Sequence, residues 1–483
     1  MESSEYWLPR LLLQRGLGLI YLMGFLVALN QFRPLCGQKG LLPATHYMQL
    51  VPFRSAPSIF YLFPSDRAFQ LFARLGTGLS LAAVTGLSEA YGTTVSMIVW
   101  FLLWAIYLSY VNIGQDFYAF GWESLLLECG FLAIFLGPVG VEPPIVIIWL
   151  YRWVLFRVMF GAGLIKMRGD PCWRDLSCLD YHFETQPMPN PVSRFFHLLP
   201  AVLRRCGVAF NHLAELVMPC LYFAPQPLAV TGGAVSAAFL FFIIVSGNFA
   251  WLNWLAFILC FSTVTTGQLP FLALEVPPFA PPPPLFDAAC WGVAILVAIR
   301  SIQPVLNMIS PAQIMNTSFD PFHLVNTYGA FGSITRERYE IVVEGTADNA
   351  PGTASRWVEY EFRGKPGDPQ GIPPLIAPYH LRLDWLMWFA AMPSRSRPLW
   401  FIHFLAKLLQ GDRQVLGLLK KNPFPDKPPL KVRALYYRYR FTTREEHRRT
   451  GRHWSRELIG EYLPEVSLSS PSFRRILQVY QLE

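Results

Sequence analysis

Charged residues are scarce in this sequence. Asp, Glu, Lys and Arg make up 15% of its 483 residues, whereas 53% are hydrophobic. Soluble domains carry about 25% charged residues, so the deficit excludes a protein that is soluble along its whole length. The scarcity is uneven, because hydrophobic stretches of membrane-spanning length fill residues 10–302, while the chain from residue 317 has an ordinary soluble composition.

The common catalytic motifs are also missing. The sequence contains no GxSxG elbow, no Walker phosphate loop, no HExxH and no CxxC, the patterns that mark several large enzyme classes. We therefore predict neither an enzyme nor a cofactor. In residues 317–483, Lys and Arg outnumber Asp and Glu by 24 to 17. The basic residues are interspersed with acids, which argues against a nucleic-acid partner and favours contact with membrane lipid headgroups or an acidic protein.

About 20 predominantly apolar residues are needed for a helix to cross a bilayer. By this criterion the sequence predicts a mainly α-helical, multi-pass membrane bundle of about eight or nine spans within residues 1–316, followed by a soluble α+β domain in residues 317–483. The first stretch lacks a small-residue cleavage site, so we expect it to remain as an anchor. The candidate spans lie near residues 11–29, 68–87, 93–111, 121–137, 144–165, 208–224, 228–246, 250–268 and 286–303.

Periodicity changes in the second part of the chain. Residues 338–346, 357–362 and 431–441 are rich in β-branched and aromatic residues and are predicted to form strands. Residues 380–392 and 398–410 have the spacing of amphipathic helices. His380 and His403 lie alone on these two helices, so we predict packing or surface roles for them rather than metal binding.

A conspicuous loop at 167–206 separates two groups of hydrophobic stretches. It holds several acids and aromatic rings and has no apolar periodicity, which is typical of an ordered loop. Cys172 and Cys178 lie six positions apart in it, and we predict that they form a disulfide, which needs an oxidising compartment. A pinned surface loop without chemistry of its own remains an alternative. Four other cysteines lie in apolar stretches, as small buried side chains do: Cys129, Cys220, Cys260 and Cys290.

Several ionisable residues fall within the predicted spans, where charge is costly and usually paired. We predict an ion pair between Glu128 and Arg157, because their helices should be antiparallel neighbours, and expect Glu123 to lie near Lys166. His212 and Glu215 have an H-x-x-E spacing, which can bind a metal ion, but the sequence has no second such pair, so no metal site is predicted. The cluster either joins helices structurally or forms a polar cavity with a function. Its members are Glu123, Glu128, Arg152, Arg157, His212 and Glu215.

Long motifs in this chain resemble the lipase maturation factor family. They are GAGLIKMRGDPCWRDLSCLDYHFETQPMPNP (161–191), SYVNIGQDFYAFGWESLLLECGFLAIFL (109–136), RWVLFRVMFGAGLIK (152–166), SGNFAWLNWL (246–255), VNTYGAFGSITRERYE (325–340) and PYHLRLDWLMWFAAM (378–392). The resemblance implies a multi-pass endoplasmic reticulum membrane protein that assists the folding and assembly of secreted, dimeric lipases such as lipoprotein lipase. Such a protein acts as a chaperone-like factor and not as an enzyme. Thr265 and Thr266 replace an acidic pair expected after the eighth span, which puts any role of that pair in doubt.

The side of the membrane is ambiguous from sequence. An odd number of spans places the loops at 30–67 and 167–206 on the same side as the tail. Positive residues in the first of these loops favour the cytoplasm, whereas the predicted disulfide and the family resemblance favour the lumen, and we adopt the lumen. There the sequon at Asn316 can be N-glycosylated. Few lysines suggest a bacterial source as an alternative, which would place the protein in the plasma membrane.

A second function remains open on the same residues. The spans distantly resemble those of vitamin K-dependent carboxylases, and the buried ionisable groups suit a membrane-embedded enzyme acting on a lipid or a quinone-like substrate. An unliganded structure in which Glu128, Arg157, His212 and Glu215 all pair off and leave no cavity would argue against that function. Transport is a weaker third alternative.

Overall fold

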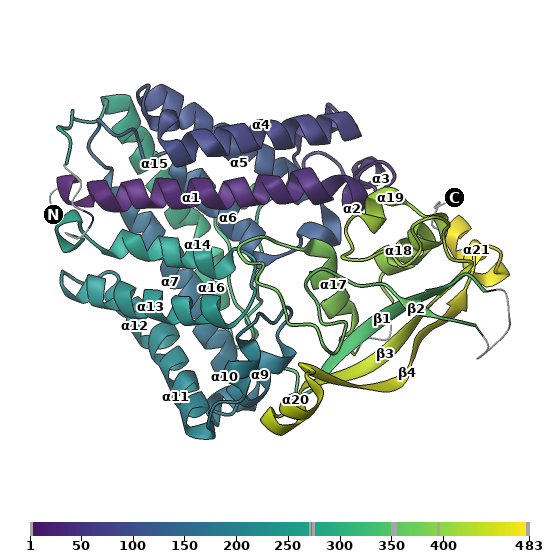
Figure 1. Ribbon diagram of the computed structural model, residues 1–483. Helices are drawn as coiled ribbons and strands as arrows, with labels where there is room; N and C mark the ends of the chain where they lie inside the picture. Colours follow the sequence, from purple (N-terminus) through teal and green to yellow (C-terminus); the bar gives the residue numbers. More distant parts are fainter. Residues whose placement is uncertain (1–2, 270–271, 273–275, 349–354, 394–396, 480–483) are drawn as a thin grey trace.

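The computed structural model of the protein describes residues 3–269, 272, 276–348, 355–393 and 397–479. A bundle of helices forms one end of the molecule, and the sheet and short helices of the tail pack against its other end (Figure 1). One continuous hydrophobic core runs through both, from Tyr21 and Trp251 in the bundle to Ile341 and Phe404 in the tail.

The bundle contains both long and short helices. Two π-helical turns, at Ala28–Phe32 and Leu213–Val217, make α1 continuous with α2 and α11 continuous with α12. The helices are α1 (Trp7–Val27), α2 (Arg33–Cys36), α3 (Ala44–Leu50), α4 (Asp66–Thr85), α5 (Thr93–Ile113), α6 (Gly121–Ala133), α7 (Ile145–Arg168), α8 (Pro171–Arg174), α9 (Leu179–Thr185), α10 (Ser193–His197), α11 (Ala201–His212), α12 (Met218–Leu221), α13 (Leu228–Ser246), α14 (Leu252–Leu259), α15 (Pro284–Arg300) and α16 (Ile302–Ile309).

Five helical stretches of the described chain are long and apolar enough to cross a membrane. Each coincides with a predicted span, and they are Trp7–Cys36, Thr93–Ile113, Ile145–Arg168, Leu228–Ser246 and Pro284–Ile309. The other four predicted spans are helical but fall short of that criterion. For example, α6 has only 13 residues and α14 has eight. The total of eight or nine spans therefore remains a prediction.

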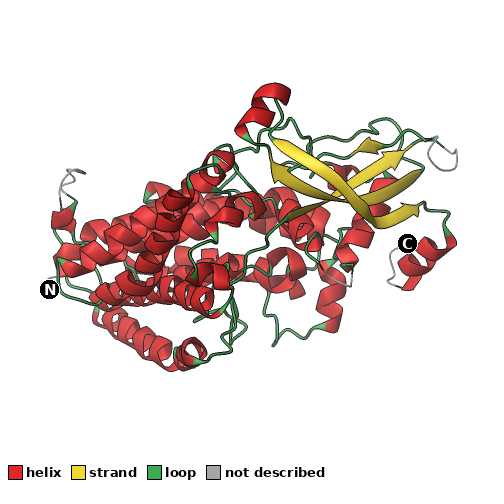
Figure 2. Ribbon diagram, turned by 90° about the horizontal axis from the view of Figure 1, so that it is seen from below, coloured by secondary structure: helices red, strands yellow, loops and turns green. Residues whose placement is uncertain are grey.

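The tail folds around a four-stranded antiparallel sheet in the order β2-β1-β3-β4. The central pair is in register from Arg338 opposite Tyr439 to Thr346 opposite Lys431. Helix α17 contacts β1 and the turn at Gln115–Tyr118 of the bundle, and α18 contacts β3 and, through Trp400 and His403, Phe117 and Leu41 of the bundle. Figure 2 shows the sheet lying across one end of the helices. The elements are β1 (Arg338–Thr346), β2 (Val358–Glu359), α17 (Arg382–Ala390), α18 (Leu399–Gln410), α19 (Arg413–Leu416), β3 (Lys431–Phe441), α20 (Arg444–Thr450), β4 (Trp454–Val466) and α21 (Pro471–Val479).

Most predicted elements of the tail are confirmed, and two differ. The strand predicted at 357–362 is only two residues long. Strand β4, which the sequence did not predict, pairs along much of β3. It is an edge strand that is largely exposed and interrupted by Gly460 and Pro464, so its residues lack the apolar alternation by which strands are recognised.

The connection between bundle and sheet passes close to α7. Gly161 of α7 and Gly169, the residue directly after α7, face the backbone of residues 328–332, and an added Cβ on Gly161 would lie 2.5 Å from the carbonyl oxygen of Tyr328. These two glycines therefore let the connecting segment lie directly against the helix, which brings β1 to the end of the bundle.

We expect Gly161→Ala to lower the free energy of unfolding by about 1–3 kcal/mol, the usual cost of overpacking. Gly292→Ala in α15 is the matched control, because nothing lies within 4 Å of a Cβ added there. That change should be neutral or stabilising by up to about 1 kcal/mol, since alanine favours helix over glycine. Thermal unfolding of the purified protein in detergent measures both, and equal effects would show that the close approach is not a constraint.

Candidate functional site

The loop after α7 is an ordered structure with a small core of its own. Asp170 caps α8 by accepting a hydrogen bond from the backbone N–H of Cys172 at 3.0 Å. Cys172 and Cys178 are joined by a disulfide, and both are buried against Trp173, Val208 and Ile334. Because Ile334 comes from the segment that leads to the sheet, the loop is part of the junction between bundle and tail.

Ion pairs and backbone contacts fasten this loop to the tail. Asp170 accepts hydrogen bonds from Arg336 at 2.7 and 2.9 Å, and these bonds lower the pKa of its carboxyl group. The buried guanidinium of Arg338 donates to the carbonyl oxygens of Glu184 and Pro187 at 3.1 and 3.0 Å. It also pairs with Glu340 at 2.6 Å. The loop is therefore held by arginines that belong to the tail.

Glu123 is held by the tail as well, and not by Lys166 as predicted. Its carboxylate pairs with Arg382 of α17 at 2.8 Å and accepts a hydrogen bond from the hydroxyl of Tyr107. His380 lies 3.7 Å from it, and burial lowers the pKa of this imidazole to about 4, with Arg382 adding to the effect. His380 is therefore neutral, and the charge of Glu123 is balanced by Arg382. The prediction failed because this partner lies 259 positions away in the sequence.

The predicted pair of Glu128 and Arg157 is present and fully buried. Glu128 also accepts hydrogen bonds from the backbone N–H and side-chain amide of Asn326, both at 3.0 Å, and from the hydroxyl of Tyr328 at 2.6 Å. Arg157 donates to the carbonyl oxygen of Asn326 at 2.7 Å. This pair thus joins α6 and α7 and also anchors the segment that leads into the sheet.

The remaining members of the predicted polar cluster have separate partners. Arg152 donates to the carbonyl oxygens of Ser262 and Tyr222 at 2.8 and 3.0 Å and to the hydroxyl of Tyr6 at 3.1 Å. His212 contacts the carbonyl oxygen of Trp173 at 2.8 Å. Within the described ranges, no group of three or more His, Cys, Asp or Glu residues is placed to hold a metal ion.

Glu215 instead pairs with Lys166. The ammonium group of Lys166 lies 2.7 and 2.8 Å from the two carboxylate oxygens of Glu215 and 2.8 Å from the side-chain oxygen of Asn211. The aromatic face of Trp173 covers the ammonium at 4.7 Å. Because Lys166, Glu215 and Asn211 are all buried, the charges of the ion pair are balanced within the protein.

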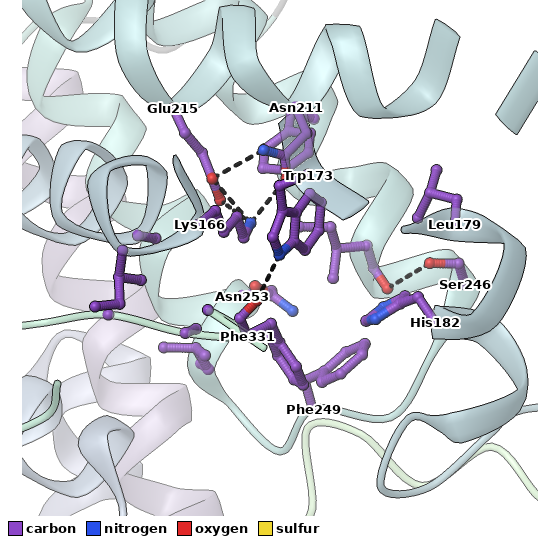
Figure 3. Close-up of a pocket in the computed structure, with 18 of the residues that line it drawn as sticks. Lys166, Trp173, Leu179, His182, Asn211, Glu215, Ser246, Phe249, Asn253 and Phe331 are labelled. Atoms are coloured by element: carbon purple, nitrogen blue, oxygen red, sulfur yellow. Dashed lines mark hydrogen bonds and ion pairs between the residues drawn. The ribbon is translucent and has the colours of Figure 1, made fainter. Parts of the chain in front are cut away.

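This ion pair borders a cavity of about 760 Å³. The cavity lies between α7, α9, α11, α13 and α14, and residues 328–333 close one side of it. Val158, Met159, Phe239 and Leu240 form much of its apolar wall. Figure 3 shows Lys166 and Glu215 at one edge and His182 and Asn253 on other sides of the same space. Its size and apolar lining with a few polar groups are typical of a small-molecule site.

The structure places the other predicted site residues as follows. Asn316 is exposed and adopts a left-handed conformation at φ 52°, and its side-chain oxygen accepts a long hydrogen bond from the backbone N–H of Gly329 at 3.4 Å. His403 is buried and bonded to the carbonyl oxygen of Leu41. His380 and His403 therefore pack in the interior, one of the two roles predicted for them.

Sequence reasoning missed the residues that join the two parts of the molecule. Arg338 and Arg382 are fully buried, yet each lies in an element whose other residues already explain it as a strand or a helix. Asn253 and His182 of the cavity gave no signal either, because a single polar residue in an apolar stretch has many structural roles. The one signal in the sequence that could have pointed to these residues is that each lies within one of the long motifs that resemble the lipase maturation factor family.

Comparisons with known proteins find similarity to lipase maturation factors along most of the chain. Residues 8–271 match the lipase maturation factor transmembrane domain, and residues 324–464 match the lipase maturation factor C-terminal domain. Lipase maturation factor 1 of Bos taurus is 42% identical, over 97% of this chain and 90% of its own length. The Homo sapiens protein of that name is 40% identical, over 98% and 91%. Lipase maturation factor 2 of Xenopus laevis is 29% identical, over 99% and 85%. No solved structure matches the chain.

We expect Arg382→Met to loosen the tail from the bundle. The substitution leaves the buried carboxylate of Glu123 without its cation, a loss that costs about 3–5 kcal/mol at buried pairs. Hydrogen–deuterium exchange of the amides in α17 should therefore become faster, and the thermal unfolding temperature should fall.

Two further variants make this test specific. The double variant Glu123→Leu with Arg382→Met removes both charges and should recover part of the lost stability. Arg438→Met is the control, because Arg438 is exposed and its ion pairs with Glu337 and Glu457 lie at the surface. Unchanged exchange in α17 after Arg382→Met would contradict the proposed role of the pair.

Proposed function

The chain belongs to the lipase maturation factor family, and from this membership we propose that it is a membrane-bound factor that assists the folding and assembly of secreted lipases. The observation that carries the proposal is the identity of 40–42% to lipase maturation factor 1 of several mammals across nearly the whole chain. The clients would be dimeric lipases of the lipoprotein lipase type.

The architecture suits a factor that presents one fixed surface to a client. The tail is joined to the bundle by the buried ion pair of Arg382 with Glu123, and to the loop after α7 by the partly exposed pair of Arg336 with Asp170 and by hydrogen bonds from Arg338 to backbone carbonyl oxygens. A client that binds the tail therefore meets a rigid body. Helix α20 has no buried residue and much of β4 is exposed, so both are accessible at this end of the molecule. We assign the binding of the client to this end.

We also propose that this end lies in the lumen of the endoplasmic reticulum. A disulfide such as Cys172–Cys178 forms in an oxidising compartment, and the loop that carries it contacts the tail directly through Asp170 and Arg336. Loop and tail therefore share one side of the membrane. The positive residues of the loop at 30–67 argue for the cytoplasm, and in this proposal the disulfide and the contact of its loop with the tail outweigh them.

An enzyme acting on a lipid is the less favoured function. The relatives are named maturation factors, and Glu128, Arg157, His212 and Glu215 each have a partner within the protein. A cavity is nevertheless present beside Glu215. The structure therefore does not combine fully paired groups with the absence of a cavity, the combination that would argue against an enzyme. Because the relatives are named maturation factors, we assign the cavity to binding.

The proposed function predicts a specific defect in lipase-secreting cells. Cells that lack their own maturation factor should secrete lipoprotein lipase of low specific activity, and expression of this chain should restore the active dimeric fraction without changing lipase synthesis. The Gly292→Ala variant is a positive control that should restore lipase activity as well as the unchanged chain does, because nothing lies within 4 Å of the added Cβ. If the chain is present at normal levels and the specific activity of the lipase does not rise, the proposal is wrong for this client.

The proposed orientation predicts glycosylation at Asn316. When the chain is expressed in a eukaryotic cell, treatment with an endoglycosidase should increase its electrophoretic mobility, and Asn316→Gln should abolish that change. Asn307→Gln is the control, because Asn307 is followed by Met308 and Ile309 and so is not part of an N-glycosylation sequon. If a reporter site introduced into the tail is modified by a cytosolic enzyme while Asn316 stays unglycosylated, the proposed orientation is wrong and the tail lies in the cytosol.

A further inference from the structure

The large cavity opens toward the outer surface of the bundle. Leu203 of α11 and Phe242 of α13 both line it, and their side chains are 53% and 54% exposed. Helix α13 is one of the stretches long and apolar enough to cross a membrane, and only a third of its most apolar window is buried in the protein. The opening between α11 and α13 therefore faces the region that lipid occupies.

The cavity is polar at one end and apolar at the other. Lys166 lies near the end of α7 that meets the tail, and Val158 lies eight residues earlier, which is roughly 12 Å deeper along the helix. Val158 and Met159 belong to the deeper wall, whereas the ring of Phe239 lies 6.0 Å from the ammonium of Lys166. A volume of about 760 Å³ is within the usual range for small-molecule sites. Such a cavity suits an amphiphile that has one apolar chain.

Two polar side chains at the polar end have no hydrogen-bond partner within the described chain. The side-chain amide of Asn253 is only 7% exposed, and it makes no hydrogen bond to any described residue. The imidazole of His182 contacts the rings of Phe249 and Phe331 and likewise makes no hydrogen bond there. Both side chains are directed into the cavity (Figure 3). An amide that faces the cavity in this way offers a hydrogen-bond donor and an acceptor to a polar ligand.

The charges around the cavity select an uncharged ligand. The three N–H donors of Lys166 are taken up by Glu215 and Asn211. Arg204, the other cation of the lining, pairs with Asp180 at 2.6 Å. Burial lowers the pKa of His182 to about 3, and the nearby Lys166 adds to this effect, so His182 is neutral. A free carboxylate or phosphate would therefore find no unpaired cation among the described lining residues.

We propose that this cavity binds a single-chain neutral lipid, such as a monoacylglycerol, with its hydroxyl or ester group hydrogen-bonded to Asn253 and His182. The acyl chain lies against Val158 and Met159, and the ligand enters between α11 and α13. The side-chain amide of Asn253 both donates and accepts hydrogen bonds, which matches a hydroxyl or an ester. This site is independent of the proposed action on lipases, and it holds whether or not a lipase is the client.

Photoaffinity labelling of the full-length protein in detergent tests this site. The probe is a long-chain monoacylglycerol that carries a diazirine within its chain and a terminal alkyne. Labelling should saturate, should be displaced by unlabelled monoacylglycerol, and should map by mass spectrometry to α7, α11 or α13. Asn253→Leu, which keeps the shape of the side chain, should weaken binding about three- to tenfold through the loss of one hydrogen bond.

Two further variants separate the cavity from nonspecific uptake. Ala162→Phe places a ring in the cavity and should abolish the saturable labelling, with its thermal unfolding measured to show that it folds. Asn30→Leu removes an exposed amide outside the cavity and should have no effect.

The proposal is overturned if labelling does not saturate, or if Asn253→Leu and Asn30→Leu behave alike. It is equally overturned if a fatty acid, a lysophospholipid or cholesterol displaces the probe better than monoacylglycerol does. Loss of lipase maturation without loss of labelling, or the reverse, shows that the two functions are separate.

Discussion

Buried charge that must be neutralised is the constraint on which the structure depends. Glu123, Glu128 and Glu340 are almost completely excluded from solvent, and an unpaired carboxylate in such a place costs several kcal/mol. Each is held by a guanidinium, from Arg382, Arg157 and Arg338 respectively. For Glu123 the acid is in the bundle and the cation in the tail, while the pair at Glu128 is completed by Asn326 and Tyr328 of the connecting segment. The tail therefore cannot leave the bundle without exposing or stranding these charges.

This constraint explains why the membrane helices and the tail form one body. Their hydrophobic core is continuous, and the segment before β1 lies against α7 where glycines leave room for its backbone. The disulfide-containing loop fills the angle between them, because its own small core includes Ile334 of that segment. Domain boundaries drawn at residue 316 describe a change in composition along the chain, whereas the packing crosses that boundary several times.

The cavity is a consequence of the same arrangement. Residues 328–333 line it directly after the point where the connecting segment is anchored at Glu128, and α9 lines it just before the point where Arg338 holds the loop. A polar end near the tail and an apolar end within the bundle follow from this placement. Both the tail and the loop therefore border the cavity.

The sequence by itself determined the hydrophobic helices, the α+β tail, the disulfide-bonded loop and the family. Each of these depends on residues close together in the chain, including the pair of Glu128 and Arg157, whose helices are sequential neighbours with a short connection. Only the tertiary structure decided the partners of Glu123 and Lys166, the pairing of β4, and the cavity with Asn253 and His182 facing it. These depend on which distant segments meet, and the buried arginines that decide it are indistinguishable in sequence from solvent-exposed ones. Local sequence patterns indicate which face of a helix or strand is apolar. They do not indicate which charge, distant in the sequence, a buried arginine of that element neutralises.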